Sequence, residues 1–323
     1  MKRYPSFIKY YVFLLISLVF FTLTLSFPSY CQDTPALTIA IIQPRNIGAY
    51  QEAVEGFLQH LRKYFKQGFN AVVYENTEGL YHTIDQNKKK LQRPGIDLIL
   101  TVGTEATSDV SHKINDIPIV FAMVLNPTAI LKHRHDIVGA SLNIPIEFYL
   151  RMIKEALPAV KTIGIIYDPT KNADFVEKSV RVAEAFELQI RSFPVKSQKN
   201  IPTALKQVNK EADALWGIVD NTVYTSQTAG FIIRDTVKGK MPFIGLSPLY
   251  VKAGALCSLG FENKDIGRQA AELAQQILAG TPVAELHTTI PEKINLAINL
   301  YTAKIIGVEI PQKILEKATI VYE

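Results

Sequence analysis

From residue 37 onward, short apolar runs alternate with longer amphipathic ones, and this alternation restricts the fold more than any other feature of the sequence. Residues 37–42 have the unbroken apolar character of a strand that is buried on both faces. Val54, Phe57 and Leu61 then recur at the three- and four-residue spacing of one helix face. Apolar strands separated by helices are typical of parallel sheets covered by helices on both faces, so the pattern predicts an α/β fold.

The strand–helix pattern runs twice along the chain, so we expect two such sheets. A helix over residues 148–157, stopped by Pro158, separates the two series. The strands expected in the first series span residues 37–42, 71–74, 97–102, 117–121 and 137–141. Those expected in the second series span residues 162–167, 189–193, 214–219, 243–246 and 255–259. Later helices are expected over residues 223–237 and through Ile266, Ala270, Leu273 and Ile277, with Gly280 as the stop.

The first 31 residues differ from the rest of the chain. Lys2, Arg3 and Lys9 precede an apolar run over residues 10–25, and residues 26–31 are mostly short or polar. This order is typical of a secretory signal peptide. The apolar run is about 16 residues long, whereas a helix that spans a membrane needs about 20. We therefore expect residues 1–31 to be a cleaved signal peptide rather than a retained anchor, and the mature protein to be exported.

The signal would be cut after Cys31, because Ser29 and Cys31 are small residues in the two positions that precede a cut. The mature chain would then begin near Gln32. A lipoprotein anchored through Cys31 is the second alternative, which the bulky Tyr30 disfavours.

The mature chain is close to neutral. The whole sequence has 35 Lys and Arg residues against 30 Asp and Glu residues, and the signal segment removes three bases and no acid. No basic stripe interleaved with aromatic residues is present, and the run Lys88, Lys89 and Lys90 is typical of a solvated helix face, so we expect no nucleic-acid partner. Cys257 is the one thiol left after cleavage, so no internal disulfide is expected. The remaining length of about 290 residues suits two domains, and we expect a monomer.

Motifs of the common enzyme classes are missing. The sequence lacks G-x-G-x-x-G, G-x-x-x-x-G-K-[ST], H-E-x-x-H and G-x-S-x-G. His133 and His135 flank Arg134, whose positive charge opposes metal binding, and Cys257 lies in an apolar strand, where a thiol is inert. We therefore expect no catalytic residue, no metal and no cofactor, and interpret the chain as a binding protein.

Polar and aromatic residues gather just after the expected strands. Ligands of open parallel sheets bind beyond the carboxyl ends of the strands, so these positions are the candidate site. The candidate ligand-binding residues are Gln43, Thr104, Glu105, Phe121, Ser141, Tyr167, Asn172, Asp220, Asn221, Ser247 and Phe261. The alternative for Thr104, Asn172 and Thr222 is that each only caps a helix.

A zwitterionic ligand would suit these side chains. Asp220 would bind its ammonium group, while Thr104, Ser141 and nearby backbone N–H groups would bind its carboxylate. Phe121, Tyr167 or Phe261 would cover an apolar part. The alternative for Asp220 is that it caps a helix beginning near Val223.

The order of several short motifs carries a resemblance to a known family. The motifs are Ile41-Ile42-Gln43, Gly103-Thr104-Glu105-Ala106, Asp116-Ile117-Pro118-Ile119-Val120-Phe121, Asn126-Pro127, Val138-Gly139-Ala140-Ser141, Ile163-Gly164-Ile165-Ile166-Tyr167-Asp168-Pro169, Asp220-Asn221-Thr222-Val223, Gly254-Ala255-Leu256, Gly267-Arg268-Gln269-Ala270-Ala271 and Leu296-Ala297-Ile298-Asn299-Leu300. Over nearly all of the mature chain the sequence resembles ABC transporter substrate-binding proteins that include tryptophan- and tyrosine-binding members and have the type I periplasmic-binding-protein fold.

This resemblance implies two Rossmann-like lobes joined by three crossings that form a hinge. We expect one lobe to comprise residues 37–141 plus 262–282, and the other residues 142–261 plus 283–323. The implied partners are a small ligand, often an amino acid and often aromatic, a membrane permease and its ATPase. An exported receptor that reports its ligand to a membrane signalling protein needs the same site and remains the alternative.

The chain departs from the family's pattern at two places in the expected site. The family often has His-Pro soon after the first strand, where this chain has Arg45-Asn46-Ile47. It often has an acid after the position of Ser247, where this chain has Pro248. Both departures leave room for a ligand other than an aromatic amino acid.

Overall fold

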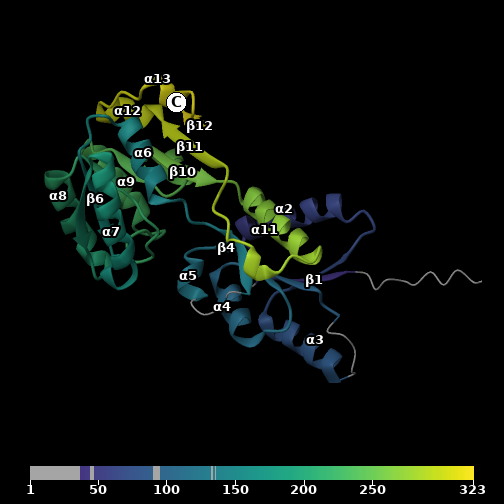
Figure 1. The fold of residues 1–323 in the computed structure, drawn as a ribbon. Helices are drawn as coiled ribbons and strands as arrows, with labels where there is room; N and C mark the ends of the chain where they lie inside the picture. Colours follow the sequence, from purple (N-terminus) through teal and green to yellow (C-terminus); the bar gives the residue numbers. More distant parts are fainter. Residues whose placement is uncertain (1–36, 44–46, 90–94, 132–133, 135) are drawn as a thin grey trace, which may run out of the picture. The chain divides into compact units, whose positions relative to one another are not determined.

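The computed structural model describes residues 37–43, 47–89, 95–131, 134 and 136–323, which form two sheets flanked by helices (Figure 1). The expected signal peptide with its cut near Gln32 lies outside the described residues, as do Arg45, His133 and His135. Within the described residues, no helix is long and apolar enough to cross a membrane.

The first sheet is entirely parallel. Its five strands lie in the order β2 (Asn70–Tyr74), β1 (Thr38–Ile42), β3 (Leu98–Val102), β4 (Ile119–Val124) and β5 (Ile137–Ser141). Successive residues of a strand point to opposite faces, so Ile39 and Ile41 belong to one core cluster and Ala40 and Ile42 to another. The apolar run of β1 is thus buried on both sides, as its composition predicts.

Helices cover both faces of this sheet. One face carries α2 (Gly48–Tyr64) and α11 (Asn263–Leu278), and the other carries α3 (Thr77–Lys89) and α4 (Thr104–Lys113). The short helix α5 (Pro127–Ile130) follows β4. Figure 1 shows α2 and α11 side by side, although about 200 residues separate them along the chain.

The backbones of α2 and α11 touch because two glycines lie at their contact. A Cβ atom on Gly267 would lie 1.8 Å from the carbonyl oxygen of Ala53, and one on Gly56 would lie 2.1 Å from the carbonyl oxygen of Lys264. Neither position tolerates a side chain unless the helices separate. These glycines therefore hold α11, a late segment of the chain, against the first sheet.

The second sheet has seven strands. Their order is β12 (Ile320–Tyr322), β11 (Ile294–Asn299), β10 (Cys257–Phe261), β9 (Phe243–Gly245), β8 (Ala214–Trp216), β6 (Thr162–Tyr167) and β7 (Gln189–Pro194). All neighbours are parallel except β10 and β11. The five strands from β7 to β10 repeat the order of the first sheet, with the second strand of the series at the edge and the first beside it. The predicted α/β class with two largely parallel sheets is confirmed.

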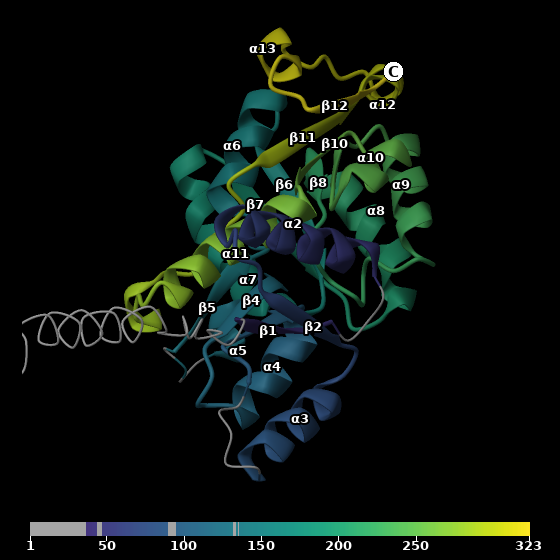
Figure 2. The same ribbon diagram turned by 90° about the vertical axis from the view of Figure 1, so that its right-hand side faces the viewer.

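Helices also flank the second sheet on both sides. One side carries α6 (Ile146–Ala156), α7 (Pro169–Ala183), α12 (Leu300–Ile306) and α13 (Gln312–Leu315). The other carries α8 (Ile201–Glu211), α9 (Ala229–Lys238) and α10 (Pro248–Lys252). Figure 2 shows α6 and α9 on opposite sides of β6 and β8.

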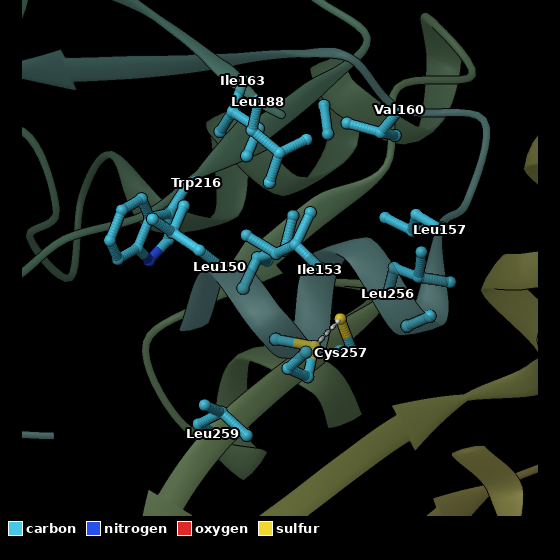
Figure 3. Packing of buried hydrophobic residues seen from close by; sticks show 14 of the residues in the cluster. Leu150, Ile153, Leu157, Val160, Ile163, Leu188, Trp216, Leu256, Cys257 and Leu259 are labelled. Atoms are coloured by element: carbon cyan, nitrogen blue, oxygen red, sulfur yellow. Dashed lines mark hydrogen bonds between the residues drawn. The ribbon is translucent and has the colours of Figure 1, made fainter. Parts of the chain in front are cut away.

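The core beneath α6 contains the chain's tryptophan and its described cysteine (Figure 3). Leu150 and Ile153 of α6 pack in one cluster with Trp216 of β8 and with Cys257. The Cys257 Sγ lies 3.8 Å from the Met152 Sδ, and burial raises the pKa of the Cys257 thiol to about 12. A thiol in this environment stays protonated, in agreement with the expectation that Cys257 is an inert core residue.

Two elements of the second series differ from their predicted bounds by three residues or more. The strand expected over residues 214–219 ends at Trp216, and the helix expected over 223–237 begins at Ala229. Between them the chain forms turns that side chains close, since Thr228 Oγ1 donates to the Val223 carbonyl and Thr225 N donates to Thr228 Oγ1. Side chains that bind nearby backbone groups compete with helix formation. The strands β11 and β12 were not predicted.

The contact between α2 and α11 requires a residue without a side chain at position 267, and a substitution there tests this requirement. We expect Gly267→Ala to lower the free energy of unfolding by about 1–3 kcal/mol, because the added methyl group overpacks a backbone contact. Chemical denaturation measures the change. Gly230→Ala on α9 is the matched control, because its Cβ would meet only the flexible tip of Arg234 at 3.4 Å. Equal stability of both variants would show that the helices do not need this contact.

Candidate functional site

The strand order places a topological switch point in each sheet. In the first sheet the chain moves outward from β1 to β2 and then crosses back to β3; in the second it moves from β6 to β7 and back to β8. Ligands of open α/β sheets bind beyond the carboxyl ends of the strands at such points. Gln43 follows β1, Thr104 follows β3, Asp168 follows β6 and Asp220 lies beyond β8. Both switch points are therefore lined with polar residues.

At the first switch point, a glycine turn brings a tyrosine against the start of a helix. Gly103 has a φ of 89° and is the N-cap of α4, so Thr104 is the first residue of the helix and not its cap. A Cβ on Gly103 would lie 2.4 Å from the Tyr50 hydroxyl oxygen. Thr104 and Glu105 are both exposed beyond this turn. Tyr50 belongs to the first turn of α2 and was not among the predicted site residues.

Two non-glycine residues, one near the end of β4 and one just after it, lie in the left-handed region. Met123 has a φ of 61° and lies at a bulge between β4 and β5, and Asn126 has a φ of 53°. Such conformations each cost of order 1–3 kcal/mol and cluster at functional sites. The Asn126 N donates to Asn143 Oδ1 at 3.2 Å, and the Asn143 N donates to Ser141 Oγ at 2.9 Å. These bonds join the loops after β4 and β5.

Ser141 also connects β5 to the segment between α11 and β11. The Ser141 N donates to the Thr289 carbonyl, and the Thr289 N donates to the Gly139 carbonyl, both at 2.9 Å. Ser141 is 2% exposed, and its hydroxyl oxygen accepts a hydrogen bond from the Asn143 N inside the protein. A returning segment of the chain is thereby attached to the first sheet.

The three candidate aromatic residues have different environments. Phe121 is 0% exposed and packs in the core beneath Gly139, so its ring offers no surface to a ligand, contrary to expectation. Its place inside β4, before the strand ends, explains this burial. Tyr167 is partly buried at the end of β6, and Phe261 packs against the core clusters of both sheets. Phe261 and Tyr167 retain exposed surface.

At the second switch point, Asp220 links the loops after β6 and β8. Its Oδ2 accepts from the Asp168 N at 2.7 Å and from Asn172 Nδ2 at 2.9 Å. Its Oδ1 accepts from the Thr222 N at 2.8 Å and from the Val223 N at 3.1 Å. Asp220 is 3% exposed, and four donors of the chain use its two oxygens fully. The carboxylate therefore has no lone pair directed away from the protein.

A second carboxylate, that of Asp168, lies in the same network. Asp168 is the N-cap residue of α7, and Asn172, the alternative candidate for this cap, lies inside the helix. Asp168 Oδ1 accepts from the Thr170 hydroxyl at 2.7 Å and the Thr170 N at 3.0 Å, and Oδ2 accepts from the Thr222 hydroxyl at 2.7 Å. Hydrogen bonds from Thr170 and Thr222 lower the pKa of Asp168 to about 2, so it is ionised at neutral pH.

Lys171 completes this network on its outer side. Its Nζ donates to Thr222 Oγ1 at 2.7 Å and to Asn221 Oδ1, and it lies 3.8 Å from Asp168 Oδ2. Asn221 is exposed. Ser247, the remaining candidate of this sheet, is the N-cap residue of α10 and makes no capping bond with its side chain.

The structure therefore joins Asn172, Asp220 and Asn221 in one hydrogen-bonded network, next to which Tyr167 ends β6. Asp168 and Lys171 are parts of this cluster that the candidate set missed. The dipeptide Asp168-Pro169 after an apolar strand is a helix-start signal and would have identified the first. No sequence signal identifies Lys171, because its contact with Asn221 spans 50 residues.

Comparison with protein families identifies the class to which this fold and site belong. The family described as ABC transporter substrate binding protein matches residues 38–322. The chain belongs to this family. Its members are solute-binding proteins and not a class of enzymes. Within the described residues, no group of three or more His, Cys, Asp or Glu residues is placed to hold a metal ion.

A curated relative has a stated ligand. The tyrosine-binding protein of Clostridioides difficile (strain R20291) is 24% identical over 287 residues, which cover 82% of this chain and 81% of the relative. An uncharacterized protein of Rickettsia prowazekii (strain Madrid E) is 24% identical over 207 residues, which cover 64% of this chain and 65% of that protein.

Solved structures show the same fold. A ligand-free, open substrate-binding protein with adhesive properties from Clostridium difficile has a TM-score of 0.75 at 19% identity, with 89% of this chain and 99% of that chain covered. An ABC domain from Streptococcus pneumonia in complex with L-Trp has a TM-score of 0.64 at 21% identity, with coverages of 88% and 99%. The expected type I periplasmic-binding-protein fold is confirmed.

The bonds of Asp220 predict a large effect of its removal on stability. Asp220→Ala leaves four donors without their acceptor, and we expect it to lower the free energy of unfolding by about 3–5 kcal/mol. For a chain of this size, the melting temperature of the ligand-free protein would fall by roughly 5–8 °C. A thermal melt measures this change.

Asp213→Ala is the matched control for Asp220→Ala. Asp213 also accepts two backbone N–H groups, those of Lys161 and Thr162, but it is exposed, so water can replace it and the loss is about 1 kcal/mol. A melting temperature of Asp220→Ala no lower than that of Asp213→Ala would show that the network does not hold the loops together.

Proposed function

We propose that this member of the family is an exported protein that captures an amino-acid-like ligand between two lobes and delivers it to a membrane permease and its ATPase. The lobes comprise residues 37–141 plus 262–282 and residues 142–261 plus 283–323. The observation that carries the proposal is the hydrogen-bonded network of Asp168, Asp220 and Thr222 at the switch point of the second sheet.

The polar groups at the two switch points suit a zwitterion. The first sheet offers the exposed Thr104 at the start of α4, where helix N–H groups and the helix dipole favour an anion. The second sheet offers oxygen acceptors next to the carboxylates of Asp168 and Asp220, and this arrangement favours a cation. An amino acid has both charges at one end, so one ligand can engage both lobes. The stated ligands of the relatives, tyrosine and L-Trp, support this chemistry.

Exposed apolar side chains at the second sheet indicate that the ligand or the closed state covers apolar surface. Val219, next to Asp220, is 61% exposed, and Leu249, at the start of α10, is 76% exposed. An exposed apolar side chain beside a polar cluster, as Val219 is, is typical of ligand sites, where a few polar groups orient a mostly apolar molecule. Tyr167 at the end of β6 is the nearest aromatic residue in sequence to this cluster. Because Pro248 replaces the family's usual acid, the side chain of the ligand need not be aromatic.

The crossings between the sheets would act as the hinge. A ligand that contacts both lobes favours the closed state by its differential affinity for that state. Phe261, at the second crossing, packs against both cores, and Thr289, in the segment between α11 and β11, is bonded to β5. Bending would then be confined to a few residues at the lobe boundaries.

Binding and closure can be measured together. We expect L-tyrosine, L-tryptophan or L-leucine to bind the mature protein in calorimetry, and small-angle scattering to show a smaller radius of gyration with that amino acid than without it, because a ligand that bridges both lobes favours closure. The corresponding D-amino acid is the control, since a site that fixes the ammonium group, the carboxylate and the side chain discriminates between enantiomers.

Two results would count against the proposal. Binding with an unchanged scattering profile would exclude closure. Cells that lack the gene but take up the bound amino acid at the normal rate would favour the alternative role of a receptor that reports to a membrane signalling protein.

A further inference from the structure

We infer that the ammonium group of Lys171 occupies the ligand's ammonium site in the ligand-free protein, so that a ligand must displace it. The inference rests on the proposed function, because it concerns a ligand that carries an ammonium group. It assigns the site to Asn221 Oδ1, Thr222 Oγ1 and Asp168 Oδ2, and it gives Asp220 a positioning role in place of the direct contact expected from the sequence.

The geometry around Lys171 matches the needs of an ammonium group. An ammonium group has three N–H donors, and three oxygens lie around the Lys171 Nζ. Thr222 Oγ1 is at 2.7 Å, Asn221 Oδ1 is within hydrogen-bond distance, and Asp168 Oδ2 is at 3.8 Å. The three oxygens come from a hydroxyl, an amide and a carboxylate, and any primary ammonium ion can use the same set.

The oxygen of Thr222 is held as an acceptor by the buried carboxylates. Its hydroxyl proton is committed to Asp168 Oδ2 at 2.7 Å, so its lone pairs face Lys171. The Thr222 N is bonded to Asp220 Oδ1, which fixes the residue from the other side. Thr222 Oγ1 and Asp168 Oδ2 are therefore in position whether or not Lys171 is present.

Asp220 is poorly suited to bind the ligand itself. Its two oxygens already accept four hydrogen bonds, and a ligand ammonium could reach it only by displacing a donor of the chain. Its negative charge still favours a cation nearby. Asp220 acts on the ligand through Thr222 and Asp168, which it holds in place.

Lys171 can leave the site, whereas Thr222 and Asp168 are fixed by other hydrogen bonds. The Lys171 side chain is 44% exposed and ends a flexible four-carbon stem, while the Asp168 side chain is 9% exposed. Two ammonium groups cannot share one set of acceptors, and their charges repel. If Lys171 fills the site for about nine tenths of the time, the apparent dissociation constant of the ligand rises about tenfold.

The direction in which one substitution changes ligand affinity tests the inference. Lys171→Met keeps an unbranched apolar stem and removes the charged ammonium group, and we expect it to tighten binding of L-tyrosine, L-tryptophan or L-leucine, whichever binds, by about five- to tenfold in calorimetry. Lys178→Met, at an exposed lysine of the same helix, is the control and should leave affinity unchanged. Weaker binding would show that Lys171 holds the ligand's carboxylate, and unchanged binding would make its contacts an ordinary surface interaction; either result overturns the inference.

A second measurement does not depend on the natural ligand. In Lys171→Ala the vacated acceptors should bind methylammonium, so methylammonium chloride should raise the melting temperature of this variant more than that of the unaltered protein. Tetramethylammonium chloride at the same ionic strength has no N–H donor and should not do so. Equal responses to the two salts would overturn the inference. If no amino acid binds, the proposed function fails, and this measurement still decides whether the ammonium site exists.

Discussion

The carboxylate of Asp220 is the interaction on which the second switch point depends. A buried charge is costly unless hydrogen bonds satisfy it, and here backbone groups of two loops and an amide of α7 do so. The same bonds fix the end of β6 relative to the end of β8. Thr222 and Asp168, two of the acceptors around Lys171, are thus arranged before any ligand arrives, which reduces the ordering cost of binding.

The first switch point is built differently. Its loops are shaped by backbone conformation, with Gly103, Met123 and Asn126 in the left-handed region, and the exposed start of α4 supplies N–H groups. One side of the proposed site therefore carries fixed oxygen acceptors and the other carries N–H donors. The contrast supports a ligand with both charges, because each switch point favours one of them.

Periodicity predicted both parallel sheets and most helices, because apolar runs such as 37–42 are buried on both faces of a sheet. It failed where side chains override the local pattern: Asp220, Thr225 and Thr228 close turns in a stretch whose apolar spacing suggests a helix. Phe121 ends the strand expected over residues 117–121, but it lies inside β4, and its ring is buried in the core. Lys171 was missed because its partners lie in another loop, and only the fold brings them together.

Native mass spectrometry of the exported protein, purified without denaturation, tests the central claim most directly. The account predicts a protein with one small molecule bound, whose mass is that of an amino acid or a close derivative with a primary ammonium group. A co-purified molecule without an ammonium group would contradict the account, as would a bare protein that binds none of the twenty amino acids when they are added.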